Sequence, residues 1–331
     1  MPRDTATPTR RRRLVVAALL AVAVAGAALT AWLTWPRHGP RGGAVPARSA
    51  IYLGIYAPSG AGAGASTGAV DAFERGLGRR VAIDQHYYDW TNPFPGRLES
   101  DDRRAGRIPL ITWQPTGVAL AEVAAGRDDA MLRERAAALR AYGRPVLLRL
   151  AHEPNGDWYT WSAAYDRGRP VPGNTAATYV RAWRHVHAVF AAAGADNVAW
   201  VWSPNFRDFP AGNRAERYYP GDDVVDWVGI DAYNGTRGEP WTGIGPLIAP
   251  LYHRYAPRKP ILLSEVGSTD GDGRRPGWID GLAAELPHRY PAVKGVVWFD
   301  KAEWQIDHAP PAFAAFARMA SARAFSAMPP A

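Results

Sequence analysis

The chain has 331 residues, of which 47% are apolar and 11% aromatic, and it contains no cysteine. This composition excludes intrinsic disorder, and the lack of cysteine excludes disulfides, thiolate metal sites and cysteine nucleophiles. The net charge of +8 lies almost entirely in residues 1–50, which carry eight arginines and one acidic residue, so the remaining chain carries only +1. The body therefore gives no charge-based indication of nucleic-acid binding.

The first 49 residues differ in character from the rest. Four arginines at residues 10–13 precede an uncharged apolar run at residues 14–35. A helix over this run would be about 33 Å long, enough to cross a bilayer. We predict that residues 1–35 form a basic region followed by a single membrane anchor, or alternatively a cleaved export signal, with the C-terminal body on the outer side of the membrane. Residues 36–49, rich in Pro, Gly and Arg, are predicted to be a linker.

Residues 50–331 are predicted to form one domain. The protein is predicted to be a monomer. Short apolar runs recur along this part of the chain, at residues 51–56, 81–85, 108–114, 145–151, 198–203, 225–231, 260–265 and 294–299. Amphipathic segments typical of helices lie between them, at residues 128–142, 175–195, 278–289 and 310–325. The apolar runs are nearly continuous rather than alternating, as in parallel strands covered on both faces. Eight such strands separated by helices indicate an α/β fold of the (β/α)8 barrel type, better than a doubly wound sheet.

The polar residues of interest follow the ends of the predicted strands. The fourth strand ends in RLAHEPNGDWYTW and the seventh in SEVG, which place Glu153 and Glu265 at two strand ends. The fifth, sixth and eighth strands end in WVWSPN, GIDAYN and VWFD. In a (β/α)8 barrel these ends form the active face. We therefore expect the two glutamates to share a groove lined by aromatic and amide side chains.

Paired carboxylates among aromatic rings suit the cleavage of glycosidic bonds. One carboxyl group must be protonated to assist the leaving oxygen, and the other must be ionised to attack the sugar. Each feature also has a structural interpretation on its own: either glutamate could pair with Arg149 or Arg181, and His152 could be a packed core histidine. Trp202 and Trp298 could likewise belong to the barrel core. The joint pattern favours catalysis over these interpretations. The histidines lack metal-binding spacing, and we predict no metal site.

Four segments of the chain resemble signatures of glycoside hydrolase family 26, namely RLAHEPNGDWYTW, WVWSPN, YYPGDDVVDWVGIDAYN and SEVGS. The resemblance covers nearly all of the chain from residue 51 and includes His152 directly before Glu153. It implies a retaining (β/α)8 hydrolase in which Glu153 is the acid/base, Glu265 is the nucleophile and no cofactor takes part. Gln114 departs from the pattern, since look-alike sequences often carry a carboxylate there, which leaves the subsite preference open.

The resemblance also implies a substrate-binding shell. His152 is expected to contact the substrate or the nucleophile, and Tyr233 to hydrogen-bond Glu265. Sugar platforms are expected from Trp158 and Trp161, and the base of the subsite before the cleaved bond from Trp298. The remaining expected members of this shell are Asn155, Trp202, Asn205, Asp231 and Trp113.

The family resemblance implies a polysaccharide substrate and leaves its identity open. Members act on β-1,4-mannan, mixed-linkage β-1,3-1,4-glucan or β-1,3-xylan, and the motifs place mannan slightly ahead. Two other classes of function stay open: a non-catalytic carbohydrate-binding barrel, and a membrane-tethered accessory to polysaccharide synthesis or export. Intact Glu153 and Glu265 argue against the first of these.

Overall fold

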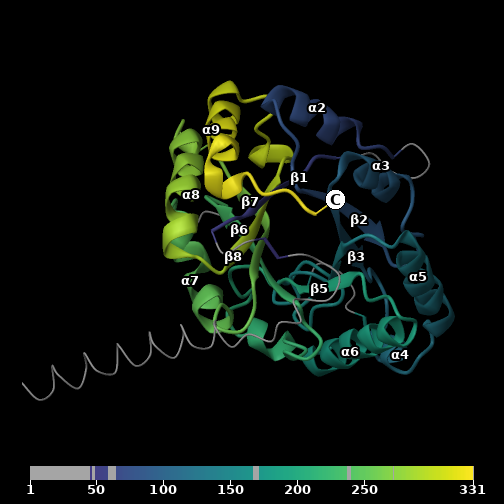
Figure 1. Ribbon diagram of the computed structural model, residues 1–331. Helices are drawn as coiled ribbons and strands as arrows, with labels where there is room; N and C mark the ends of the chain where they lie inside the picture. The colour runs from purple at the N-terminus through teal and green to yellow at the C-terminus, as the bar shows by residue number, and fades with distance from the viewer. Residues whose placement is uncertain are drawn as a thin grey trace, which may run out of the picture. The chain divides into compact units, whose positions relative to one another are not determined.

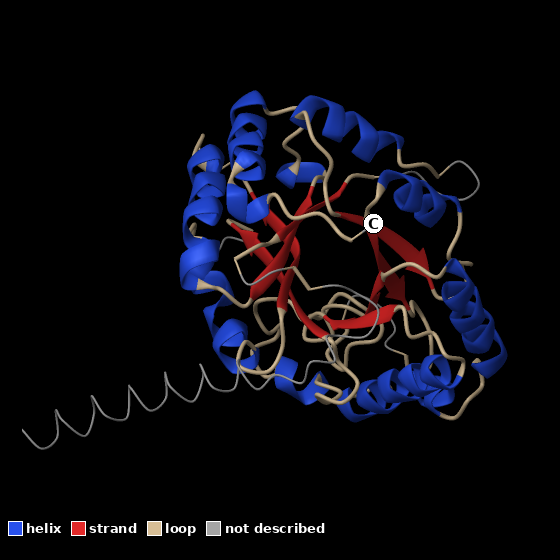
Figure 2. Ribbon diagram, in the orientation of Figure 1, coloured by secondary structure: helices blue, strands red, loops and turns tan. Residues whose placement is uncertain are grey.

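The computed structural model describes residues 45–46, 49–58, 65–166, 171–236, 240–270 and 272–330. Within them, eight parallel strands close into a barrel in chain order, from β1 to β8, and helices cover its outside (Figures 1 and 2). The predicted (β/α)8 barrel is therefore confirmed. The anchor or signal segment and most of the linker lie outside the described residues. No helix in the described part of the chain is both long enough and apolar enough to span a membrane.

All eight predicted strands are present. Their bounds are β1 Tyr52–Tyr56, β2 Ile83–Asp89, β3 Ile108–Gln114, β4 Val146–Leu150, β5 Val198–Trp202, β6 Trp227–Asn234, β7 Ile261–Ser268 and β8 Val293–Phe299. The barrel closes because β1 pairs in parallel with β8 as well as with β2.

The described helices include four that the sequence pattern predicts and four that it does not. The predicted ones are α5 Asp129–Tyr142, α6 Ala176–Ala192, α8 Arg275–Arg289 and α9 Pro310–Ser321. The others are α2 Gly68–Leu77, α3 Arg97–Ala105, α4 Leu120–Ala124 and α7 Ile244–Tyr255. Three short 3-10 helices follow β5, β8 and α9, namely η2 Ala215–Tyr218, η3 Ala302–Trp304 and η4 Arg323–Phe325. The pattern misses α3 because that helix is almost entirely polar, and α7 because it contains Pro250.

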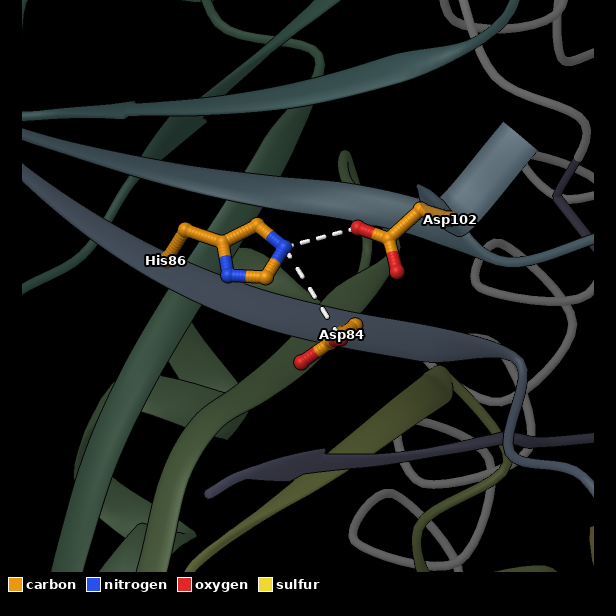
Figure 3. Close-up of side chains that lie close together, drawn as sticks. All are labelled: Asp84, His86 and Asp102. Carbon is orange, nitrogen blue, oxygen red and sulfur yellow. Dashed lines mark hydrogen bonds and ion pairs between the residues drawn. The ribbon is translucent and has the colours of Figure 1, made fainter. Parts of the chain in front are cut away.

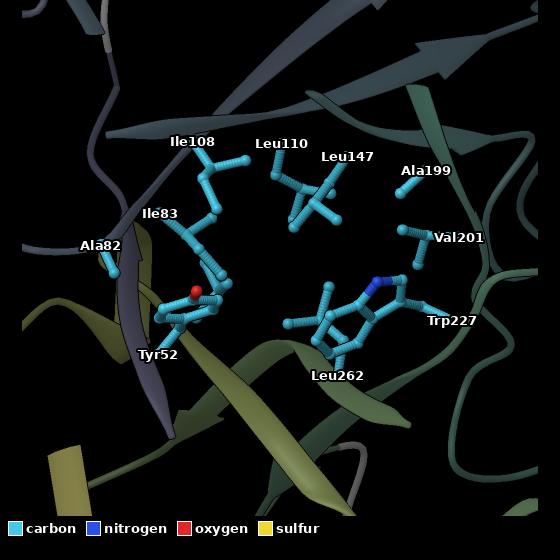
Figure 4. Packing of buried hydrophobic residues seen from close by; sticks show 11 residues of the cluster. Tyr52, Ala82, Ile83, Ile108, Leu110, Leu147, Ala199, Val201, Trp227 and Leu262 are labelled. Atoms are coloured by element: carbon cyan, nitrogen blue, oxygen red, sulfur yellow. The ribbon is translucent and has the colours of Figure 1, made fainter. Parts of the chain in front are cut away.

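The lower part of the barrel is filled by apolar side chains from alternate positions of the strands (Figure 4). Successive side chains of a strand point to opposite faces, so every second residue reaches the barrel interior. Gly54 lets β1 lie close to β2, since a Cβ atom there would lie 2.7 Å from the Cβ of Ile83. The packed interior leaves the upper, C-terminal end of the barrel for polar side chains.

The outward face of β2 carries a buried ion network. His86 Nε2 lies 2.7 Å from Asp102 Oδ2 on α3 and 3.8 Å from Asp84 Oδ2, and it points between the two carboxylates (Figure 3). Arg107 pairs with Asp102 at 3.2 Å and with Glu74 of α2 at 2.7 Å. Arg107 also lies 3.8 Å from Asp84, so it places a positive charge against the same two carboxylates that flank His86. The network joins α2 and α3 to β2, whose opposite face reaches the upper end of the barrel.

The network predicts a pH-dependent contribution to stability. Burial alone would lower the pKa of His86, but Asp84 and the hydrogen bond to Asp102 outweigh it and raise the pKa to about 9. Since this pKa lies above the ordinary histidine value of 6.5, the stabilisation is complete below about pH 6.5 and is lost as the pH rises through 9. We expect His86→Gln to lower the free energy of unfolding by about 3–5 kcal/mol at pH 6, and by less at pH 9.5, in urea titrations.

His185→Gln is the matched control for this experiment. His185 also pairs with a carboxylate, that of Asp129 at 2.6 Å, but both side chains are about one quarter exposed. We expect a loss below about 1 kcal/mol for this variant. A loss for His86→Gln that is the same at both pH values would contradict the assignment.

Candidate active site

A cavity of about 410 Å³ opens at the C-terminal end of the barrel. In (β/α)8 barrels this end carries the active site. Five residues predicted from the sequence line it: Glu153, Trp158, Asn205, Tyr233 and Glu265. The other lining residues are Tyr159, Phe206, Phe209, Thr236, Phe299, Glu303 and Trp304.

The two predicted glutamates face each other in this cavity. A carboxylate oxygen of Glu153 and one of Glu265 lie within 4.8 Å of each other, together with one of Asp231. Retaining glycosidases hold their two carboxyl groups about 5–5.5 Å apart, whereas inverting enzymes leave about 6.5–9.5 Å for a water molecule. The close approach of the two carboxylates fits the shorter of these separations.

A β-bulge in β7 aims Glu265 into the barrel. Between Leu263 and Val266 β7 has one residue more than β8, and its pairing with β6 shifts over the same stretch. Because strand side chains alternate, a regular strand with Ser264 inside would turn Glu265 outward. With the extra residue both face inward: the Ser264 hydroxyl donates to Asp231 at 2.6 Å, and Glu265 reaches the cavity.

Glu153 is aimed by an unusual backbone at the end of β4. Both Ala151 and Glu153 have a φ of 47°, in the left-handed region that non-glycine residues rarely adopt. The surroundings hold this conformation, since the Glu153 N–H donates to the Ser203 carbonyl at 2.7 Å and the Ala151 N–H donates to the Trp113 carbonyl at 2.9 Å. Residues held in such conformations concentrate at functional sites.

The Glu265 carboxylate accepts hydrogen bonds from Arg149, Tyr87 and Tyr233. The contact from Tyr233 is the one expected from the family resemblance. Burial alone would raise the pKa of Glu265, but the positive charge of Arg149, together with the hydrogen bonds from Tyr233 and Tyr87, lowers it to about 2. Glu265 is therefore ionised at neutral pH, as an attacking carboxylate must be.

Arg149 is the buried cation that joins the two inner carboxylates. It is fully buried on β4 and donates to Asp231 at 2.9 Å and to Glu265. Its Nε donates to Thr112 at 3.0 Å, so the guanidinium is held on several sides. From the sequence, Arg149 was considered only as a structural ion-pair partner of a glutamate. It does pair with Glu265, and the same contact lowers the pKa of that carboxylate.

Glu153 has surroundings of the opposite kind. Asn205 donates to its Oε1 and Trp158 to its Oε2, both at 2.6 Å, and no arginine or lysine among the described residues pairs with it at salt-bridge distance. Burial and the nearby charge of Glu265 raise the pKa of Glu153 to about 7. Two carboxyl groups in one cavity thus have pKa values pushed apart, which is the arrangement needed for one acid and one ionised nucleophile.

His152 lies beneath the cavity rather than on its wall. Its side chain is buried, with Nε2 2.9 Å from the hydroxyl of Tyr159. Burial and the charge of Arg149 hold the pKa of His152 well below its ordinary value, so the ring is neutral. Through Tyr159, which lines the cavity, His152 supports the site from behind.

Four predicted tryptophans of the binding shell lie elsewhere. Trp113, Trp161, Trp202 and Trp298 are all fully buried and do not line the cavity. Trp161 stacks on Tyr159 at 4.3 Å, so it backs the cavity instead of forming a sugar platform. The expectation of direct sugar contact is wrong for these four in the described structure.

The alternation of side chains along a strand explains why Trp113, Trp202 and Trp298 do not line the cavity. Val201 and Val297 belong to the interior cluster, so the next residues, Trp202 and Trp298, point outward to the helices. Trp298 packs against Trp278 of α8, and the core interpretation of Trp202 and Trp298 is confirmed. Trp113 likewise faces outward, where it stacks on a neighbouring tryptophan at 4.3 Å.

Asn155 and Asp231 are fully buried and support the cavity from below. The Asn155 side chain donates to the carbonyl of Asn205 at 3.0 Å and accepts from the N–H of Asn205 at 2.9 Å. It thereby fixes the residue that bonds Glu153. Asp231 holds Arg149, as described above.

Several lining residues were not predicted from the sequence. Trp304 of η3 packs on Tyr233 with ring centroids 4.4 Å apart, in the part of the cavity where Trp298 was expected. Phe299 follows Trp298 in β8 and therefore faces inward. Tyr87 on β2, which donates to Glu265 without lining the cavity, was also not predicted; its alternation with Gln85 and Ile83 along the strand places it inside the barrel.

A model of the family described as glycosyl hydrolase family 26 matches residues 122–271, which include both glutamates. Endoglucanase H of Acetivibrio thermocellus is 33% identical over 261 residues, covering 76% of this chain and 29% of that protein. The chain belongs to glycosyl hydrolase family 26.

Further family-26 relatives are similar over shorter stretches or in fold alone. A mannan endo-1,4-beta-mannosidase of Caldalkalibacillus mannanilyticus is 30% identical over 170 residues, covering 49% of this chain and 29% of that protein. The crystal structure of a ruminal family 26 endo-beta-1,4-mannanase superposes with a TM-score of 0.62 at 18% identity, covering 84% of this chain and 64% of that one. The chain thus spans about three tenths of the length of the relatives named first.

The buried Arg149 predicts a second stability experiment. Arg149→Met leaves two buried carboxylates without their cation, and we expect a loss of about 3–5 kcal/mol in the free energy of unfolding at pH 7. The folded pKa of Glu265 lies below the ordinary glutamate value of 4.5, so this contribution is present above about pH 4.5 and fades as the pH falls through 2. Urea titrations at pH 7 and pH 4 measure the loss, which should be smaller at pH 4.

Arg184→Met serves as the control, because Arg184 pairs with Asp223 at 2.6 Å with both side chains largely exposed. That variant should lose less than about 1 kcal/mol. If both variants lost the same free energy of unfolding, Arg149 would not be the cation that stabilises the buried carboxylates.

Proposed function

We propose that this chain is a retaining endo-β-glycanase that cleaves its polysaccharide with Glu153 as acid/base and Glu265 as nucleophile. The observation that carries the proposal is the pair of carboxylates within 4.8 Å of each other, one with its pKa raised to about 7 and the other with its pKa lowered to about 2. A binding protein without catalysis has no need for this difference, because ligand contact does not require opposite protonation states.

The proposed reaction is a double displacement. In the first step the Glu265 carboxylate forms a bond to the anomeric carbon while the glycosidic bond breaks, and the Glu153 proton passes to the leaving oxygen. In the second step Glu153 takes a proton from water, whose oxygen replaces Glu265 on the anomeric carbon. Two inversions restore the original configuration. The chain's own side chains account for every proton in both steps.

The charge of the site changes between the two steps in the required direction. Once Glu265 is esterified its negative charge is gone, and that charge is one of the causes that raise the pKa of Glu153. The pKa of Glu153 therefore falls in the intermediate, and the acid of the first step becomes the base of the second.

Aromatic side chains support a sugar polymer as the substrate. Trp158, Phe206 and Phe209 line the cavity on the side of Glu153, and Phe299 and Trp304 line it near Tyr233. Flat apolar sugar faces stack on such rings. The cavity is partly open to solvent, so a chain can reach it from outside.

For the substrate we place β-linked glucan first and β-1,4-mannan second. The relative that matches 76% of this chain is named an endoglucanase, while the mannanase relative matches 49%. The sequence motifs alone had placed mannan slightly ahead, with β-1,3-xylan as a further possibility. The apolar run at residues 14–35 supports export of the domain, tethered to the membrane or released, and either a degradative or a biosynthetic setting fits this topology.

Substitution of the two glutamates tests the function. We expect the purified chain to release reducing sugar from lichenan or mannan, and Glu265→Gln to reduce the rate to background. Glu153→Gln should lose about 10²–10⁴-fold on natural polysaccharide, the contribution typical of general acid catalysis. Proton NMR of fresh product should show the β anomer first. An active Glu265→Gln variant, or α product, would overturn the assignment, and binding without cleavage by the parent chain would favour the carbohydrate-binding alternative.

The pH dependence of kcat/KM gives an independent test. The reactive form has Glu265 ionised and Glu153 protonated, so activity requires a pH above about 2 and below about 7. We expect kcat/KM to fall about tenfold per pH unit above pH 7, as Glu153 loses its proton. A profile that rises from pH 6 to 9 would exclude Glu153 as the acid.

A further inference from the structure

Both oxygens of the Glu153 carboxyl group are held by groups that can only donate. The indole N–H of Trp158 donates to Oε2 and the side-chain amide of Asn205 donates to Oε1, each at 2.6 Å. The two donors come from different loops, one following β4 and the other following β5. The plane of the carboxyl group is therefore fixed at both ends.

Gly156 makes room for the Trp158 ring. A Cβ atom at Gly156 would lie 2.5 Å from both Cε2 and Cζ2 of Trp158, far inside van der Waals contact. Cε2 is the ring atom bonded to the indole nitrogen, so the ring edge that reaches Glu153 is the edge that lies on this glycine. Gly156 itself is tied to the same turn, since its N–H donates to the Glu153 carbonyl at 3.0 Å.

We infer that Trp158, seated on Gly156, is a positioning residue for Glu153: its indole N–H holds the carboxyl group in the orientation from which the proton reaches the leaving oxygen. This inference rests on the proposed function and adds to the sugar-platform role expected for Trp158. The indole proton is not transferred. The only proton that moves is the one that Glu153 gives to the glycosidic oxygen and later recovers from water.

The hydrogen bond has a consequence that stacking on a sugar lacks. A carboxylate accepts a stronger hydrogen bond than the neutral acid, so the Trp158 N–H favours the ionised form of Glu153. It opposes burial and the charge of Glu265, which raise the pKa of Glu153. Loss of the N–H must move that pKa further up, whereas loss of a stacking surface alone leaves it in place.

Trp158→Phe tests the inference because phenylalanine keeps an aromatic face and removes the N–H. We expect the alkaline limb of the kcat/KM profile to move upward by about 0.5–1 pH unit, the size of one ordinary hydrogen bond expressed as a pKa shift. At pH 5, where Glu153 is protonated in both proteins, kcat should fall about tenfold or more because the acid is less well oriented.

Gly156→Ala is the second variant, since it keeps the indole and displaces it from Glu153. It should shift the limb in the same direction. Phe209→Leu is the matched control: its ring lies 5.8 Å from that of Trp158 in the same wall, but it makes no hydrogen bond to Glu153. This control should raise KM and leave the alkaline limb where it is.

The titration of Glu153 is also read by carbon-13 NMR of the glutamate Cδ atoms, with Glu153→Gln to assign the signal. An upward shift in Trp158→Phe and Gly156→Ala, absent in Phe209→Leu, supports the inference. A wild-type titration curve in Trp158→Phe, or the same shift in Phe209→Leu, overturns it. The NMR experiment does not depend on activity. If the parent chain cuts no β-glycan, the proposed function fails, but the titration of Glu153 still shows whether Trp158 acts on that carboxyl group.

Discussion

The arrangement of the site depends on one buried cation. Arg149 lies inside the barrel where water cannot solvate it, and a charge in that position requires partners. Asp231 and Glu265 satisfy it, and in return Glu265 remains ionised at a depth where burial alone would raise its pKa. Glu153 lies nearby without a cationic partner of its own. The two glutamates therefore differ in pKa because Arg149 pairs with Glu265 and not with Glu153.

The contacts that make up this arrangement all lie within the protein. The tyrosines on Glu265, the donors on Glu153 and the neutral His152 beneath them are all fixed by contacts within the protein. Groups that are already oriented need little reorganisation as charge develops during the reaction. The surrounding (β/α)8 scaffold makes this possible, because it holds each group at the end of a rigid strand or in a loop anchored to one.

The sequence was sufficient to predict the barrel and the two glutamates that face each other in its cavity, and insufficient for much of the wall around them. Continuous apolar runs reveal buried parallel strands, and strand ends reveal which residues meet at one face. The tryptophans show the limit of this reasoning. Trp298 and Phe299 are neighbours in one motif, yet only Phe299 lines the cavity, because strand register decides which of the two turns inward. Trp304 lies in a short 3-10 helix after β8, and no periodic pattern marks its position.

The β-bulge in β7 shows how strand register determines whether Glu265 reaches the cavity. With regular pleating throughout β7, Leu262 and Ser264 would still face the barrel axis, and the carboxylate of Glu265 would lie in the apolar layer beneath the helices. A family-26 sequence can therefore retain both glutamates and the whole barrel and still turn the second glutamate away from the cavity, if its seventh strand lacks the extra residue of the bulge. In comparing members of this family, the spacing of residues in that strand is as informative as the identity of the acidic residue it carries.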